Sequence, residues 1–216
     1  MENEIYKKYS FLDCPNVSRE TFYQFDEFVS MIINKSTEIN IVSRKNLTKE
    51  LIIERHLIDS AQIIDFIDLN SNTTSDLGTG GGFPGIVIAI MLKNLKNDMK
   101  FNLYEKSYHK SRFLKDVSKK LGLYTDVIQT DIFESKNLSS GTIIARAFKP
   151  LPTVLDLVCR NFKSYKNLIL FMGKNGQKIL KESLKIWDFD YTEKKSLTSR
   201  DSFILNITNI KKKKLS

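Results

Sequence analysis

The chain has 216 residues, and 41% of them are hydrophobic, so it can bury the core of one ordinary domain and is not generally disordered. Residues 1–70 contain 8 basic and 12 acidic residues, whereas residues 71–216 contain 26 basic and 13 acidic ones. A basic body favours a polyanionic partner such as nucleic acid, although a lysine-rich surface that only keeps the chain soluble has the same charge.

The cysteines and the apolar runs set further limits. Cys14 and Cys159 are too few for a disulfide framework, which is typical of proteins from a reducing compartment. The longest apolar run, IVIAIML at residues 86–92, is far too short to span a bilayer, and the opening residues have no apolar stretch typical of a signal peptide. We therefore expect a cytoplasmic protein with no membrane association.

Residues 1–70 are predicted to form an N-terminal helical extension, and residues 71–216 a second domain. Apolar residues recur at helical spacing in the first stretch, at Phe22, Phe25, Phe28, Val29, Ile32 and Ile33. A second helical stretch covers residues 47–67, and Thr48 is a suitable N-cap for it.

After residue 72, predicted strands and helices alternate. The strands are expected at residues 74–78, 101–107, 125–131, 141–147 and 167–173, with helices at residues 84–96, 109–123, 152–162 and 176–187. Gly122 is expected to end the second of these helices, and Cys159 to be a buried structural cysteine in the third. The order predicts an α/β fold with a doubly wound, mostly parallel sheet of Rossmann-like type. Two further strands, 190–197 and 202–212, are separated by a short turn, so the C-terminal strand should be antiparallel.

The first strand–helix turn contains an unusual glycine cluster. The segment SDLGTGGGFPG at residues 75–85 holds five of the 9 glycines in the chain. Ligands of such sheets bind beside this turn, and glycine lets the backbone approach them closely. Gly78 and Gly80 match the dinucleotide fingerprint G-x-G-x-x-G, but Phe83 occupies its third glycine position. The D-x-G-x-G-x-G pattern that begins at Asp76 is instead similar to the loop of class I methyltransferases, which holds the methionine part of S-adenosylmethionine. A tight turn without a ligand is the alternative.

Residues that follow the other strands fit the same ligand. Glu105 ends the second strand, where its carboxylate can accept hydrogen bonds from both ribose hydroxyls of an adenosine ligand. Ile132 and Phe133 follow the third strand and could flank an adenine ring, with core packing as the alternative. Arg146 ends the fourth strand, where its guanidinium could bind the cofactor carboxylate or an RNA phosphate, unless it is only a surface arginine.

Four motifs together resemble the RsmG/GidB family over roughly residues 38–177. They are ERHLIDS at residues 54–60, DLGTGGGFPG at 76–85, KSRFL at 110–114 and ARAF at 145–148. The resemblance implies a class I methyltransferase domain at residues 71–216 that transfers a methyl group from S-adenosyl-L-methionine to ring nitrogen 7 of a guanine in small-subunit (16S) ribosomal RNA, either naked or in a ribosomal particle. It also implies cofactor contacts by Gly78, Phe83, Ile132, Phe133 and Arg146.

The chain departs from the family pattern in two places. Members commonly have Lys-Gly after the fifth strand, whereas this chain has Met172 before Gly173, so the lysine has either moved to Lys174 or been lost. Phe133 stands where an acidic residue is often found. The roles of Arg55 and His56, on a helix that could close over the cofactor, stay open, because a structural histidine fits equally well.

Guanine nitrogen 7 already has a free lone pair, so we expect positioning groups, with Arg146 among them, and no acid/base pair. We expect no metal, since neither histidine has neighbouring ligands in the sequence, and we expect a monomer. Phosphate contacts are expected from basic residues that could equally be only solvated, namely Lys110, Arg112, Lys115, Lys119, Lys120 and Lys211–Lys214. Phe83, Phe133 and Phe148 are candidates for stacking on the target base.

Three other functions remain open at this point. The chain could methylate a different RNA, a small molecule or a protein, although its basic body and the ERHLIDS motif favour ribosomal RNA. It could be a nicotinamide-dependent oxidoreductase, which Phe83 disfavours. It could also be a non-catalytic RNA-binding assembly factor that keeps the fold.

Overall fold

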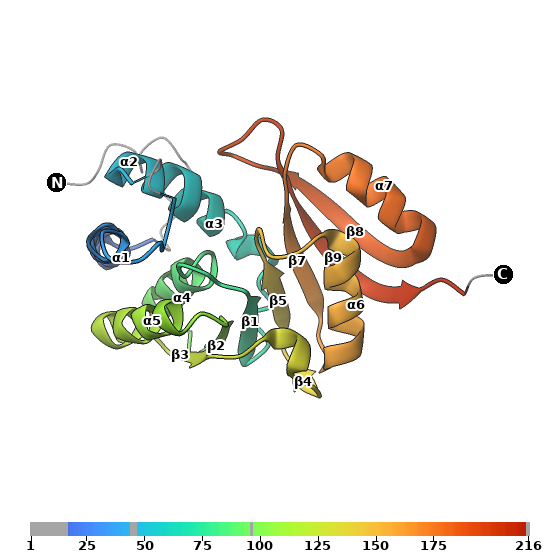
Figure 1. Cartoon of the computed structure of the whole chain (residues 1–216), viewed down its shortest axis with the longest axis horizontal. Helices are drawn as coiled ribbons and strands as arrows, with labels where there is room; N and C mark the ends of the chain where they lie inside the picture. The colour runs from blue at the N-terminus through green and yellow to red at the C-terminus, as the bar shows by residue number, and fades with distance from the viewer. Residues whose placement is uncertain (1–16, 44–46, 96, 215–216) are drawn as a thin grey trace.

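The structure is a computed structural model that describes residues 17–43, 47–95 and 97–214. Its centre is a seven-stranded sheet with the order β3-β2-β1-β5-β7-β9-β8 (Figure 1). The strands in that order are Thr125–Ile128, Lys100–Tyr104, Thr73–Leu77, Thr142–Ala145, Asn167–Met172, Phe203–Lys212 and Trp187–Lys195. The first five pair in parallel, and β9 pairs antiparallel with both β7 and β8. The predicted α/β class and the antiparallel C-terminal strand are therefore confirmed.

Helices cover both faces of the sheet. In Figure 1, α4 (Gly85–Asn94) and α5 (Tyr108–Leu121) lie on one side, and α6 (Leu151–Asn161) and α7 (Gly176–Ile186) on the other. Successive strand residues point to opposite faces, so Ile143 packs with α6 while Ile144 packs with α4 and α5. This double burial explains why the strands read as continuous apolar runs.

Local signals in the sequence identified several helix ends. The hydroxyl of Thr48 accepts a hydrogen bond from the Leu51 amide at 3.3 Å, as expected of an N-cap. Gly122 follows α5 in the left-handed conformation, with φ of +59°, which confirms it as the residue that ends this helix. The prediction that Cys159 is buried is wrong, because this residue lies on the exposed side of α6.

The N-terminal helices share a core with the sheet. Helix α1 (Arg19–Ser36) buries Phe25 and Phe28 in the same cluster as the apolar residues of α4 and α5. The second stretch is continuous but irregular: α2 (Lys49–Ile52) leads into a π-helix, η4 (Ile53–Ile58), and then into α3 (Asp59–Ala61). The boundary predicted at residue 70 stays a prediction.

Short elements complete the chain. Two 3-10 helices, η5 (Ile64–Phe66) and η6 (Ile132–Glu134), lie in connections, and β4 (Leu138–Ser139) pairs in parallel with β6 (Phe162–Ser164) outside the main sheet. The sequence did not predict this pair, because two or three residues are too few to show an apolar period. In the part of the chain that the structure describes, no helix has the length and apolar character needed to cross a bilayer.

Candidate active site

The turn after β1 needs glycine for two different reasons. Gly78 has φ of +67° and Gly82 has φ of +96°, backbone conformations that residues with a side chain rarely adopt. A Cβ on Gly78 would lie 2.3 Å from Cδ2 of Phe148, so this position also requires a bare backbone next to the ring. A Cβ on Gly82 would lie 2.7 Å from Cγ1 of Ile86 in the core. Part of the cluster therefore serves packing, and Gly78 keeps backbone accessible at the sheet edge.

Asp76 lies beneath this turn and is fully buried. Its Oδ2 accepts a hydrogen bond from the Gly85 amide at 2.8 Å, while its Oδ1 has no partner among the described residues. Burial raises the pKa of Asp76 to about 6, because removal from water disfavours the charged carboxylate. Asp76 thus joins the end of β1 to the start of α4, and its predicted contact with a cofactor stays a prediction.

Glu105, directly after β2, braces the turn from the other side. Its Oε2 accepts a hydrogen bond from the Gly80 amide at 3.0 Å, and its Oε1 accepts one from the Ser107 amide at 2.7 Å. These bonds fix the orientation of the carboxylate. Each oxygen keeps a second lone pair, so Glu105 can still accept hydrogen bonds from ligand hydroxyls.

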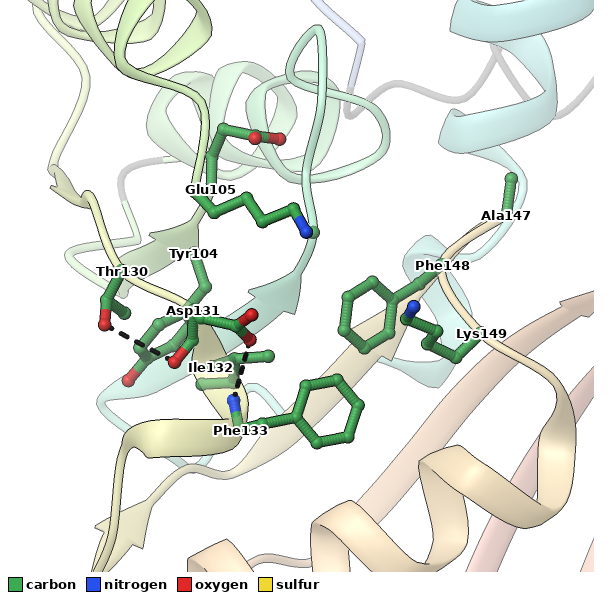
Figure 2. Close-up of a pocket in the computed structure, with 11 residues that line it drawn as sticks. Tyr104, Glu105, Thr130, Asp131, Ile132, Phe133, Ala147, Phe148 and Lys149 are labelled. Carbon is green, nitrogen blue, oxygen red and sulfur yellow. Dashed lines mark hydrogen bonds between the residues drawn. The ribbon is translucent and has the colours of Figure 1, made fainter.

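A cavity of about 270 Å³ opens beside the turn, at the carboxyl ends of β1, β2, β3 and β5 (Figure 2). It is lined by Gly78, Tyr104, Glu105, Lys106, Thr130, Asp131, Ile132, Phe133, Ala147, Phe148 and Lys149. Figure 2 shows the rings of Phe133 and Phe148 facing each other, with their centroids 6.0 Å apart and an angle of 24° between their planes. The cavity therefore combines carboxylates that can accept hydrogen bonds from ligand hydroxyls with apolar side chains. This combination fits a nucleoside ligand.

The third strand contributes a short, fixed wall to this cavity. Asp131 caps η6 by accepting a hydrogen bond at its Oδ1 from the Phe133 amide at 3.2 Å. Ile132 is buried, whereas the Phe133 side chain is 40% exposed. Of the residues predicted to contact a cofactor, Gly78, Glu105, Ile132 and Phe133 are therefore brought together around one cavity.

Phe83 and Arg146, also predicted to contact the cofactor, do not line the cavity. The Phe83 ring stacks on His56 with centroids 5.1 Å apart and contacts Phe28 at 5.3 Å. The Arg146 guanidinium faces the N-terminal helices and binds Oδ2 of Asp59 through Nε at 3.0 Å and Nη2 at 2.8 Å. Their contacts with a cofactor stay predictions, and the structure places both side chains in the joint between the extension and the sheet.

Asp59 is a site residue that the sequence reasoning missed. Besides Arg146, its carboxylate accepts hydrogen bonds from Gln62 at 2.8 Å, Thr198 at 2.9 Å and Ser196 at 3.3 Å. It therefore ties helix α3 to the end of β5 and to the β8–β9 connection. Its position one helical turn after His56 was the available signal, since residues three apart share a helix face.

Arg146 also controls a strained piece of backbone at the cavity. The next residue, Ala147, has φ of +48°, which is unfavourable for any residue with a side chain. Ala147 leads directly to Phe148, the ring that covers Gly78. The ion pair between Arg146 and Asp59 thus anchors the segment that forms one wall of the cavity.

His56 is held uncharged in the same network. Its Nδ1 lies 3.2 Å from Nη1 of Arg146, and because arginine only donates, Nδ1 must accept and the proton must be on Nε2. Burial, followed by the positive charge of Arg146, lowers the pKa of His56 to about 4. The Nε2 atom is buried without a hydrogen-bond partner among the described residues. These contacts favour a structural histidine over one that titrates during a reaction.

The two candidate positions for the family lysine differ in exposure. Met172, at the end of β7, is buried, and Lys174 is exposed in the following turn. Which of them corresponds to that lysine stays open. Within residues 17–43, 47–95 and 97–214, no three histidine, cysteine or acidic side chains are grouped as metal ligands.

Replacing Asp59 by Asn should lower the free energy of unfolding by roughly 1–3 kcal/mol, because Arg146 loses its charged partner in a largely buried site. Asp65→Asn is the matched control. It breaks the ion pair between Asp65 and Lys194, in which the Asp65 side chain is 72% exposed. Such exposed pairs contribute little, so the control should change stability by less than about 0.5 kcal/mol. Urea unfolding of both variants measures the difference, and equal losses would contradict the role of Asp59.

The low pKa of His56 should make stability depend on pH. Between about pH 6.5 and pH 4, the unfolded chain binds a proton at His56 that the folded protein does not, so stability falls as pH falls. From pH 7 to pH 5, the wild type should lose roughly 1–2 kcal/mol more unfolding free energy than His56→Gln. The raised pKa of Asp76 acts in the opposite direction and is common to both proteins. Fluorescence of the buried Trp187 reports unfolding, and identical pH profiles would refute the assignment.

Comparison with known proteins agrees with this site. The family model described as GidB, rRNA small subunit methyltransferase G, matches residues 21–207. The chain is 60% identical over 210 residues to the ribosomal RNA small subunit methyltransferase G of Pelagibacter ubique (strain HTCC1062), covering 97% of this chain and 99% of that protein. It is 34% identical to the protein of the same name from Bartonella tribocorum (strain CIP 105476 / IBS 506), covering 98% and 99%.

Among solved structures, a SAM dependent methyltransferase from Aquifex aeolicus matches with a TM-score of 0.55 at 14% identity, covering 81% of this chain and 95% of that one. This likeness concerns the fold alone, and it agrees with the strand order and the helices on both faces of the sheet. The match of the family model to residues 21–207 and the 60% identical relative confirm the resemblance indicated by the four sequence motifs. The chain belongs to the rRNA small subunit methyltransferase G family.

Proposed function

We propose that this protein transfers the methyl group of S-adenosyl-L-methionine to ring nitrogen 7 of a guanine in small-subunit (16S) ribosomal RNA. The observation that carries the proposal is the cavity formed by Gly78, Glu105 and Ile132 at the carboxyl edge of the sheet, in a chain of this family. We further propose that it acts in the cytoplasm, as a monomer and without a metal, on the RNA alone or on a ribosomal particle.

The residues around the cavity fit an adenosine-containing cofactor. The fixed Glu105 carboxylate can accept hydrogen bonds from ribose hydroxyls, and Ile132 and Phe133 offer apolar surface for a base. The bare backbone at Gly78 allows the rest of the molecule to approach closely. When bound, S-adenosylmethionine supplies a methyl group activated by an adjacent sulfonium.

The chain itself has to orient the acceptor. Guanine nitrogen 7 has an in-plane lone pair and no proton to remove, so none of the carboxylates needs to act as a base. Orientation of the reacting groups and exclusion of water can contribute about 7–11 kcal/mol of barrier reduction. In this proposal, Phe133 and Phe148 limit the position of the bases, and Arg146 acts as a positioning residue through the segment that carries Phe148.

Labelled S-adenosylmethionine, incubated with the protein and undermethylated small subunits, tests the proposed reaction. We expect label on nitrogen 7 of one guanine of the small-subunit RNA, because the carboxyl edge of the sheet combines a nucleoside cavity with exposed lysines. Mapping the modified nucleotide by reverse transcription after chemical cleavage identifies it. Label on another RNA, a protein or a small molecule, or binding of particles without transfer, would overturn the proposal in favour of the corresponding alternative.

Gly78→Asp should abolish cofactor binding. Its Cβ would overlap Phe148, and its carboxylate would enter the cavity next to Glu105, so we expect affinity for S-adenosylhomocysteine to fall at least about a hundredfold. Gly173→Asp adds the same charge where a Cβ meets no atom within 4 Å, and it should bind normally. Calorimetry on both folded variants decides, and unchanged affinity of Gly78→Asp would refute this placement of the cofactor.

A further inference from the structure

Two exposed lysines flank the mouth of the cavity from different strands. Lys106 follows Glu105 after β2, and Lys149 follows Phe148 after β5, as Figure 2 shows for the second of them. Within the described part of the chain, neither makes an ion pair or a side-chain hydrogen bond in the structure. Glu105 and Asp131 line the same cavity, but neither forms an ion pair with these lysines, so both ammonium groups can contact an anion at the cavity mouth.

A second hollow continues from Lys149 along the same edge. Pro150 and Pro152 begin α6 and face the first turn of α7, and the two helices lie next to each other in Figure 1. The hollow has a volume of about 470 Å³ and is lined by Pro150, Pro152, Asn175, Lys178, Ile179 and Glu182. We call it the α6–α7 groove. Because Lys149 lines the cavity and Pro150 lines the groove, the two hollows are neighbours along this edge of the sheet.

The charges along this groove are mainly positive. Lys178 lines it, and exposed Lys174 lies in the turn that precedes it; among the described residues neither is ion-paired. Glu182, the acidic residue of the groove, is bound to Lys185 at 2.8 Å. Prolines and Ile179 supply apolar surface between the cationic groups. This combination suits single-stranded RNA, whose phosphates need cations and whose riboses and bases pack on apolar surfaces.

We propose that the α6–α7 groove, with Lys149 and Lys178, binds the single-stranded RNA next to the base that enters the cavity. The proposal rests on the proposed function, since it takes the target base to be unstacked into the neighbouring cavity. Lys106, on the far side of the mouth, contacts the strand beyond that base. An acidic protein could also bind the lysines, but it has no need of a proline-lined hollow beside the reaction site, so the groove favours RNA as the ligand.

This placement differs from two of the phosphate contacts that the sequence suggested, the lysine tail and Lys120. Strand β9 starts opposite Met172 at the carboxyl edge and runs antiparallel, so Lys211–Lys214 lie at the opposite edge of the sheet. There the Lys213 ammonium donates a hydrogen bond to the Leu184 carbonyl at 2.7 Å. Lys120 of α5 faces Glu27 at 3.6 Å. The lysine tail is therefore remote from both the cavity and the groove.

The test compares two double variants of the full chain that remove equal charge. Lys174→Gln with Lys178→Gln changes the groove, and Lys163→Gln with Lys214→Gln changes exposed positions at the opposite edge. Binding of a labelled single-stranded RNA oligonucleotide is measured by anisotropy from low to high salt. The groove variant should bind about tenfold more weakly, and its slope of log affinity against log salt should drop by about 1.4, because each phosphate contact contributes about 0.7. The control should match the wild type in both.

A third variant tests the apolar part of the groove without risking the fold. Pro152→Glu places an acid in the first turn of α6, where the helix dipole favours it, yet it puts a negative charge in the path of the phosphates. We expect weaker RNA binding than the wild type at every salt concentration. Calorimetric affinity for S-adenosylhomocysteine should stay unchanged in this variant and in the groove double variant.

Three outcomes would overturn the groove proposal. Equal losses in the groove and control variants would indicate unspecific attraction, and unchanged RNA affinity in the groove variants would show that the strand lies elsewhere. If the groove double variant lost as much affinity for a polyglutamate peptide as for the RNA, the groove would be a site for an acidic protein. Wild-type methyl transfer to small subunits is measured in the same preparation, so RNA binding through the groove without transfer would refute only the proposed function.

Discussion

The turn after β1 depends on one buried interaction, the hydrogen bond from the Gly85 amide to Asp76. It joins the end of the central strand to the first turn of α4 and leaves the intervening glycines to pass between them. Burying this carboxylate costs free energy, and the raised pKa of Asp76 reflects that cost. The hydrogen bond offsets part of it. Glu105 completes the arrangement from β2 through the Gly80 amide. With both ends fixed, the backbone at Gly78 lines the cavity and lies directly against the Phe148 ring.

A second interaction sets the opposite wall of that cavity. The Asp59–Arg146 pair is largely buried, with side chains 14% and 18% exposed, and it joins the N-terminal helices to the segment that carries Ala147 and Phe148. The π-helical turn η4 lies immediately before Asp59, and such turns change which residues a helix presents to its neighbours. The extension is thus part of the structure of the proposed active site, because the shape of the cavity depends on contacts that residues 53–61 supply.

The two edges of the sheet carry different features because parallel strands all end on the same side. The cavity, Lys106, Lys149 and the α6–α7 groove gather at the carboxyl edge, where the connections after β2, β3, β5 and β7 meet. The antiparallel β9 starts there and carries the lysine-rich tail away from it. Net charge indicated a polyanionic partner, while strand direction decides which of the many lysines lie at the same edge as the cavity.

The sequence by itself determined the alternation of strands and helices, the glycine turn, the acid after the second strand and the helix ends at Thr48 and Gly122. All of these depend on apolar periodicity, on glycine conformation or on capping, which act within a few residues. The motifs also determined the family. Only the tertiary structure decided that Arg146 faces Asp59, that Phe83 packs under His56, and that Phe133 and Phe148 meet across a cavity. These contacts join residues far apart in the chain, and their partners follow from how helices and strands pack, which no local pattern encodes.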